Sequence, residues 1–167
     1  MKNEYKINGE ETVIYTNYKD EKIEFIIDTS DLELVSSIKG KWLALKHHSG
    51  NFYIRGPLNG KRILLHRFIM KPEKDLVVDH INHNPLDNRK SNLRVLTNAE
   101  NRQNLKGARI DNSTGIRGVK YDKKYDLWIA SVRVNGEYIG LGGFKTQQEA
   151  EKAAIEGRKK HLPYSTN

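Results

Sequence analysis

The alternation of hydrophobic and polar residues predicts short strands over residues 1–64. Two β-rich runs, at 12–15 and 22–27, stand on either side of a polar turn at 17–20. Three further strands are expected at 42–45, 51–55 and 62–65, with Ser-Gly and Asn-Gly turns between them. Residues 31–38 fit a short helix or a loop. We therefore expect this first segment to be a small β platform against which the next segment packs.

A different pattern occupies residues 65–106. Residues 65–70 predict one or two helical turns, and the apolar run at 76–78 predicts a short strand. A polar loop rich in Asn, Asp and Pro comes next, followed by a second strand at 93–96. Thr97, with a Glu three positions later, forms a capping-box signature, so a helix should begin there. The segment is thus predicted to run strand, loop, strand, helix.

Residues 107–112 have the composition of a linker, and residues 113–167 form a third segment. Its strands are expected at 116–121, 127–134 and 138–144. An Asn135-Gly136 pair predicts a two-residue hairpin turn. A second capping box, at Thr146, opens a helix with small residues along one side. This segment therefore predicts a three-stranded antiparallel sheet packed on one helix.

Strand alternation separates the two faces of that sheet. Trp128 lies on one face of the middle strand and Arg133 on the other. We expect the Trp128 face to pack against the helix and the Arg133 face to stay open. Taken together, the three segments predict an α+β chain with a β platform at 1–64, a central unit at 65–106 and a small sheet-and-helix domain at 113–167.

Charge is distributed unevenly along the chain, whose net charge is +8. Residues 1–40 carry a net charge of −4, whereas residues 41–100 and 101–167 carry +6 each. A basic body favours a polyanionic partner. The chain has no cysteine, which excludes disulfides and thiolate zinc sites. No apolar run approaches the ~20 residues of a membrane span, and no secretory signal opens the chain, so we expect a cytoplasmic location in a bacterial or phage-infected cell and no membrane partner.

The candidate chemistry lies in the central unit. Asp79 and His80 follow the first predicted strand, Asn92 precedes the second, and Asn101 falls in the first turn of the predicted helix. Carboxylate and amide oxygens suit Mg²⁺, and an imidazole can take a proton from water near neutral pH. Phosphodiester hydrolysis needs such a base together with charge stabilisation. Asp79 and His80 point to opposite sides of a regular strand, so we expect a bend or a strand end there.

These residues resemble the HNH nuclease motif in the His-Asn-Asn variant of phage and intron-encoded homing endonucleases. The resemblance covers about residues 62–105 and implies a ββα-metal (His-Me finger) unit. It implies His80 as the general base, Asp79 and Asn101 as ligands of Mg²⁺ or another divalent cation such as Mn²⁺, and Asn92 as a catalytic-loop brace. One departure is His83, where the family often has Gly; a His80–His83 zinc pair is disfavoured because no further Cys or His clusters there.

The third segment resembles the ethylene-response-factor type of DNA-binding domain. The resemblance rests on the runs Arg-Gly-Val-Lys, Trp-Ile-Ala-Ser-Val-Arg and Leu-Gly-Gly-Phe and on the helix that follows. It implies that the sheet enters the major groove of double-stranded DNA. The implied contacts come from Arg117, Lys120, Ser131, Arg133 and Tyr138. Gly140 departs from the plant members, which often have Trp there.

The sequence therefore predicts a metal-dependent, homing-type DNA endonuclease whose last domain selects the target. We expect double-stranded DNA as partner, no small-molecule cofactor and a monomer. One alternative is a non-catalytic DNA-binding regulator that keeps a nuclease-derived fold. A second alternative is an RNA-binding or RNA-processing protein, which exposed aromatic side chains stacking on single strands would favour.

Overall fold

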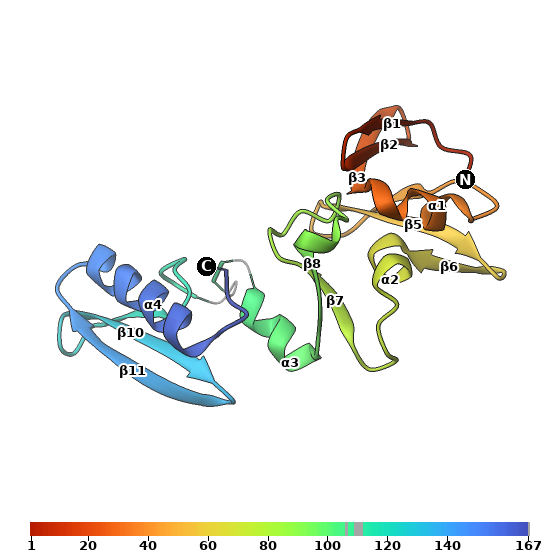
Figure 1. Cartoon of the computed structure of the whole chain (residues 1–167). Helices are drawn as coiled ribbons and strands as arrows, with labels where there is room; N and C mark the ends of the chain where they lie inside the picture. The colour runs from red at the N-terminus through yellow and green to blue at the C-terminus, as the bar shows by residue number, and fades with distance from the viewer. Residues whose placement is uncertain (106, 109–111, 167) are drawn as a thin grey trace. The chain divides into compact units, whose positions relative to one another are not determined.

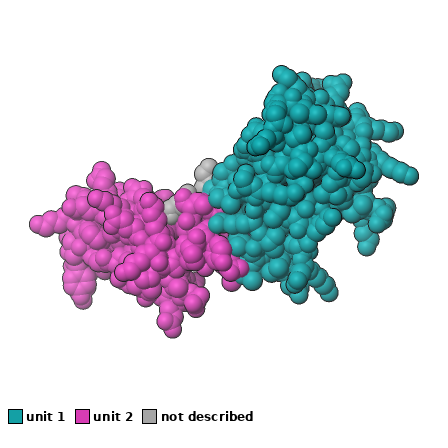
Figure 2. Space-filling view, in the orientation of Figure 1, with its two compact units in different colours: residues 1–98 teal, residues 99–167 magenta. Residues whose placement is uncertain are grey.

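The computed structural model describes residues 1–105, 107–108 and 112–166. The chain divides into two compact units, Met1–Asn98 and Ala99–Asn167 (Figure 2). Within the described ranges the fold is mixed α/β, with small antiparallel sheets and few helices. The predicted α+β class is confirmed at this level.

The first sheet of unit 1 has the order β1-β2-β3 and is antiparallel throughout. Its strands are β1 (Tyr5–Asn8), β2 (Glu11–Tyr18) and β3 (Glu21–Asp28). Both β-rich runs of the sequence lie in it, and Lys19 turns the chain between them at φ 54°. The 3-10 turn η1 (Thr29–Asp31) and helix α1 (Leu32–Ser36) follow.

A second antiparallel sheet, β4-β5-β6, confirms the predicted meander. Its strands are β4 (Leu43–Lys46), β5 (Phe52–Leu58) and β6 (Lys61–Leu64). Helix α2 (Leu65–Met70) follows directly and ends where Lys71 takes a left-handed conformation. Helix α2 packs against β5 and β6, and it also packs against the next pair of strands along the chain (Figure 1).

That pair consists of β7 (Val77–His80) and β8 (Leu93–Leu96), which are antiparallel and in unbroken register. The loop between them contains a 3-10 turn, η2 (Lys90–Asn92). His80 is the last residue of β7, as the sequence predicts. The strand does not bend at Asp79, so the expected change of direction comes only at the strand end.

One hydrophobic core holds all of unit 1 together. Phe25, Trp42 and Ile54 from the first 64 residues pack in the same buried cluster as Leu65 and Leu93. Burying such large apolar side chains is the main favourable contribution to folding. The predicted division after residue 64 is therefore not a boundary between compact units, and the segment 1–64 serves as the packing platform of the segment that follows.

Unit 2 begins inside a short helical segment, α3 (Asn98–Asn101) followed by the 3-10 turn η3 (Arg102–Asn104). The helix predicted at Thr97 is thus real but only four residues long. Asn recurs at 98, 101 and 104, and Asn is a weak helix former, which explains the early change to 3-10 geometry. Residues 109–111 of the predicted linker lie outside the described residues.

The sheet of unit 2 has the order β11-β10-β9 and is antiparallel. Its strands are β9 (Val119–Asp122), β10 (Leu127–Val134) and β11 (Glu137–Phe144). Helix α4 (Gln147–His161) covers one face, and its predicted capping box at Thr146 is present (Figure 1). The first strand starts three residues later than predicted, because Gly118 turns at φ +82° and lies against the Ser131 backbone oxygen, which a Cβ would approach to 2.4 Å.

Packing in unit 2 confirms the predicted faces of the sheet. Ala130 and Val132 are buried on the helix side, where Ala130 packs with Ala150 and Ala154 of α4. Trp128 is half-buried against the same cluster. Arg133 is exposed on the other face. The sheet thus has one covered face and one open face.

Candidate functional site

The candidate site in unit 1 starts with an ion pair across β7 and β8. Asp79 lies opposite Arg94 in the strand register. The Arg94 guanidinium donates from Nε at 3.0 Å and from Nη2 at 2.8 Å, both to Asp79 Oδ2. Both side chains are largely buried, so this pair is screened less than a surface pair. Nothing in the motif spacing marked Arg94 as the partner of Asp79, although direct cross-strand register was the signal available.

His80 lies on the opposite side of the strand from Asp79 and is 6% exposed. Its Nε2 lies 3.4 Å from Asn88 Oδ1. Because Asn88 donates from Nδ2 to the Pro85 carbonyl at 3.2 Å, its oxygen faces the imidazole, which places the His80 proton on Nε2. Nδ1 is then the nitrogen with a lone pair for a proton.

The electrostatics keep His80 ready to accept a proton. Burial lowers the pKa of His80, while the hydrogen bond to Asn88 and the charges of Asp79 and Asp87 act in the raising direction. The imidazole is therefore neutral at neutral pH, the protonation state of a general base. Asn88 lies in the polar loop between the two strands, and the structure shows it as the partner of His80.

Two aromatic side chains enclose His80. The His66 ring from α2 lies edge-on to the His80 ring, with their centroids 5.0 Å apart. The Tyr53 ring from β5 is also edge-on to the His80 ring, at a centroid distance of 6.4 Å. Burial lowers the pKa of His66 to about 3, so His66 is neutral as well. Burial and the charge of Asp79 raise the pKa of Tyr53, which keeps the phenol protonated. The two rings that face the imidazole are thus uncharged.

Asn92 ties down the loop that carries the site. Its Oδ1 accepts from the Asn82 backbone at 3.0 Å and its Nδ2 donates to the Asp87 carbonyl at 2.8 Å. Asp87 is buried and pairs with Arg89 at 2.7 Å, and this hydrogen bonding lowers the pKa of the Asp87 carboxyl. His83 sits in the same loop at φ 60°, in the left-handed region that Gly adopts most readily.

The β platform also holds this loop in place. Ile26 of β3 exchanges backbone hydrogen bonds with the loop, accepting from Asn88 and donating to Leu86, both at 2.8 Å. Asp28 accepts from the Lys90 backbone at 2.7 Å. Arg89 pairs with Glu11, and Lys90 pairs with Asp31 at 2.5 Å. The acidic first segment therefore contacts the basic loop through complementary charges.

The predicted metal ligands fall in different units. Asp79 belongs to unit 1, and Asn101 is the half-buried last residue of α3 in unit 2. Their pairing stays a prediction. Both offer oxygen, the donor that Mg²⁺ prefers, and two protein ligands leave coordination positions for water and phosphate. Among the described residues no group of three or more His, Cys, Asp or Glu is placed to hold a metal.

Four of the five predicted DNA-contacting residues share the open face of the sheet in unit 2. Lys120 lies opposite Ile129, which alternates with Ser131 and Arg133 along β10. Tyr138 lies opposite Arg133 and is 72% exposed, with the guanidinium 5.4 Å from its ring centre. Gly140, opposite Ser131, has open space where a side chain would stand.

Arg117, the fifth predicted DNA contact, is engaged elsewhere. It precedes β9, and its Nη1 donates to the backbone carbonyls of Gln103 at 3.0 Å and Leu105 at 2.8 Å. Burial lowers the pKa of its guanidinium without neutralising it. The structure therefore does not bring Arg117 onto the open face with the other four.

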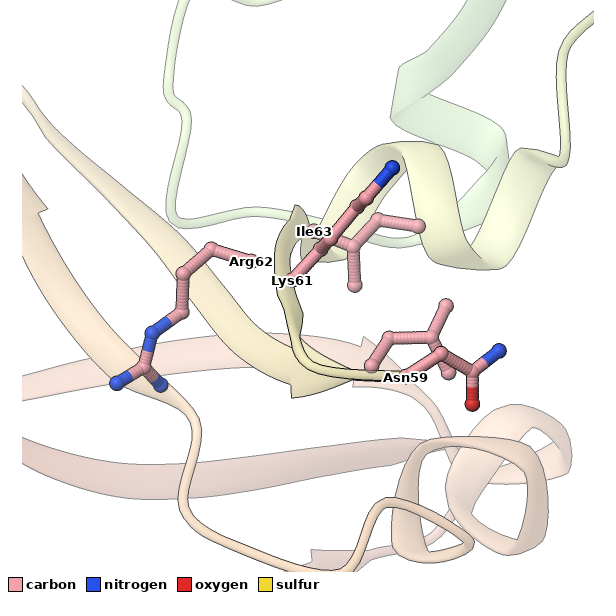
Figure 3. Close-up of a pocket in the computed structure, with 5 residues that line it drawn as sticks. Asn59, Lys61, Arg62 and Ile63 are labelled. Atoms are coloured by element: carbon pink, nitrogen blue, oxygen red, sulfur yellow. The ribbon is translucent and has the colours of Figure 1, made fainter.

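A hollow lies beside the β5–β6 turn of unit 1. Figure 3 shows its lining side chains, with Arg62 extending away from Asn59. The residues that line it are Leu58, Asn59, Lys61, Arg62 and Ile63. None of them belongs to the site residues predicted from the sequence.

In the described part of the chain, no helix has the length and apolar character needed to cross a membrane.

Comparison with known proteins finds a family match in the central unit. Residues 65–103 match the family model described as HNH endonuclease. The matched range contains Asp79, His80, Asn92 and Asn101. The chain is also similar to Protein 3.8 of Escherichia phage T7, with 33% identity over 64 residues, which are 38% of this chain and 52% of that protein.

A second viral relative covers more of the chain. An uncharacterised HNH endonuclease of Acanthamoeba polyphaga mimivirus is 34% identical over 95 residues, which are 53% of this chain and 48% of that protein. The chain thus spans about half the length of each of these curated relatives. No solved structure matches the chain significantly. An endonuclease family and two viral relatives are therefore the comparisons on which a functional proposal can rest.

Proposed function

We propose that this protein is a metal-dependent DNA endonuclease of homing type, in which the HNH domain cleaves phosphodiester bonds and the sheet of unit 2 selects the target. The observation that carries the proposal is His80. It is a buried, neutral imidazole whose Nε2 is held by Asn88, and it lies inside the segment that matches the HNH family.

In this proposal His80 acts as the general base. With Nε2 turned to Asn88, Nδ1 takes the proton of the attacking water. The Asn92 brace holds the loop so that Asn88 keeps the ring in this orientation. The neutral His66 and Tyr53 rings exclude competing charges from the imidazole.

We propose Asp79 and Asn101 as the protein ligands of one Mg²⁺ or Mn²⁺ ion. Their oxygen donors fit a hard cation, and the family of residues 65–103 supports the assignment. The bound ion would supply charge stabilisation for the phosphate and the leaving oxygen. Arg94 donates to Asp79 Oδ2 at 2.8 Å, so its guanidinium would compete with the cation for this carboxylate.

For target selection we propose the open face of the unit 2 sheet as a DNA-binding surface, in the manner of an ethylene-response-factor-like domain. Lys120 and Arg133 supply positive charge, and Ser131 and Tyr138 supply hydrogen-bonding groups beside them. Gly140 has no side chain, which leaves space at this point of the sheet for the wall of a DNA groove. The net charge of +6 over residues 101–167 favours this partner.

A plasmid-cleavage assay tests the proposal. The full-length protein is incubated with supercoiled DNA in Mg²⁺ or Mn²⁺ and in EDTA, and the expected product is nicked or linear DNA only with metal. His80→Ala should abolish the product while retaining DNA binding, and His48→Ala, at an exposed position, should cleave normally. Full metal-dependent cleavage by His80→Ala would overturn the mechanism. Binding without cleavage by the unaltered protein would favour the regulator alternative.

A further inference from the structure

The segment that carries Asn101 depends on distant parts of unit 2 for its position. Residues 98–104 form only one α-helical and one 3-10 turn, too short to be stable in water without tertiary support. The support comes from the other end of the unit. Anchors to this segment are contributed by Arg117 and by the stretch that follows helix α4.

Arg117 supplies the charged anchor. Its guanidinium donates to the carbonyls of Gln103 and Leu105, at the end of the helical segment where carbonyls lack helical partners. A cation at this end also interacts favourably with the helix dipole. Arg158 of α4 donates to the Arg117 carbonyl at 2.7 Å and fixes the backbone from which the guanidinium extends.

A second anchor lies on the other side of the same turn. Asn104 is 4% exposed, and its Oδ1 accepts from Thr166 Oγ1 at 2.6 Å and from the Thr166 backbone at 3.3 Å. The Tyr164 backbone donates to the Gln103 side chain at 3.4 Å. Arg117 and Thr166 therefore both hydrogen-bond to the turn that directly follows Asn101.

We infer that Arg117 is a positioning residue for the candidate metal ligand Asn101, and that Thr166 supports the same segment from its other side. This inference rests on the proposed function. It assigns Arg117 a role within the protein in place of the direct DNA contact that the sequence resemblance implies. The two roles make opposite predictions for an Arg117 variant.

The test compares Arg117→Ala, Arg117→Lys and Thr166→Val with the open-face control Arg133→Ala, all in the full chain. Hydrogen exchange of the 98–105 peptide, Mn²⁺ affinity by calorimetry and DNA affinity in Ca²⁺ are measured for each. Circular dichroism confirms folding. Arg117→Lys keeps the charge but replaces the planar guanidinium, whose Nη1 donates to both carbonyls, with a single ammonium on a different stem.

The Arg117 variants are expected to exchange the 98–105 amides faster and to bind Mn²⁺ several-fold more weakly, with DNA affinity within about two-fold of the unaltered protein. Thr166→Val should show the same changes to a smaller degree. Arg133→Ala should show the reverse, with normal exchange and weaker DNA binding. Unchanged exchange and Mn²⁺ affinity in Arg117→Ala, together with a loss of DNA binding equal to that of Arg133→Ala, would overturn the inference.

The readouts also separate this inference from the proposed function. Failure of the unaltered protein to cleave DNA would refute the nuclease proposal alone. Exchange and Mn²⁺ affinity do not depend on cleavage and would still decide whether Arg117 positions the ligand. If exchange rises but Mn²⁺ affinity stays constant, Arg117 supports the fold only and the positioning role is refuted.

Discussion

Asp79 and His80 are consecutive residues of β7, yet their partners hold them on opposite sides of the strand. The Asp79 carboxylate receives the Arg94 guanidinium at 2.8 Å, whereas the His80 imidazole turns to the Asn88 amide at 3.4 Å. Strand geometry separates the two side chains, and the unbroken register to β8 preserves that separation. The proposed ligand and the proposed base are thus controlled by different neighbours and can be perturbed independently.

Removing Arg94 should strengthen metal binding at Asp79. In Arg94→Gln the carboxylate loses a positive neighbour that competes with a cation, so Mn²⁺ affinity measured by calorimetry should rise roughly three- to ten-fold. Asp79→Asn should lower it, and Arg62→Gln, an exposed position in β6, should leave it unchanged. Equal Mn²⁺ affinity in Arg94→Gln and the unaltered protein would show that Asp79 is not the ligand.

Asn92→Ala should destabilise unit 1. It leaves the Asn82 amide and the Asp87 carbonyl without the partner they have inside the loop, which should cost about 2–3 kcal/mol of the free energy of unfolding. Urea denaturation followed by circular dichroism measures the change. The exposed Asn51→Ala serves as control, with an effect within about 0.5 kcal/mol. If Asn92→Ala lowers the free energy of unfolding no more than Asn51→Ala does, Asn92 does not stabilise the loop.

Stability should fall on acidification because of His66. The pKa of His66 is about 3 in the folded protein against 6.5 for an unperturbed imidazole, so the unfolded chain binds more protons between these values. The contribution is therefore complete above pH 6.5 and is lost as the pH falls toward 3, with a loss of about 2 kcal/mol at pH 5.

Chemical denaturation at pH 7 and pH 5 measures this dependence. His66→Gln, which cannot titrate, should show a smaller difference between the two pH values than the unaltered protein. His48→Gln, at an exposed position, should keep the full difference. Burial also lowers the pKa of His80, so His80 contributes a loss of stability in the same direction, and this part remains in both variants. The lowered pKa of the Asp87 carboxyl matters only below its ordinary value of 3.8, outside this pH range. An unchanged pH dependence in His66→Gln would exclude His66 as its source.

Substitutions on the open face of the sheet should separate specific from non-specific DNA binding. Arg133→Ala is expected to weaken binding to a preferred site by about 1–3 kcal/mol, whereas Lys120→Ala should weaken all sequences alike and lower the salt dependence by about one counterion. Fluorescence anisotropy over a salt series measures both. Lys160→Ala on α4, the helix that covers the other face, is the control. Losses no greater than the control would assign DNA binding to another surface.

Periodicity and turn chemistry were enough to predict most elements of the fold. Alternation located β2, β3 and β10, and the capping box located the start of α4, because these signals are local. The late start of β9 was missed because it depends on how closely Gly118 approaches the Ser131 backbone. The joint packing of both halves of unit 1 was also missed, since a shared core is set by contacts between residues far apart in sequence.

The residues of the candidate site also fall into those that local sequence signals predict and those that only the folded structure reveals. Motif spacing located His80 and Asn92, whose roles stay predictions, but not Asn88 or Arg94, which act through the loop fold and the strand register. Arg117 shows the limit of the argument by resemblance. Its position in the sequence matches a DNA contact, while its side chain is directed to the carbonyls of Gln103 and Leu105.

The boundary between Asn98 and Ala99 decides where unit 2 can be exchanged for another domain. A chimera joined within residues 107–112, where composition places the linker, would keep Gln103 and discard Arg117. A junction placed before Ala99 would transfer the turn and both of its anchors as one piece. Under the proposed function, exchange of the module would then replace the candidate ligand Asn101 together with the DNA-reading sheet, so each hybrid would have to supply its own residue at this position.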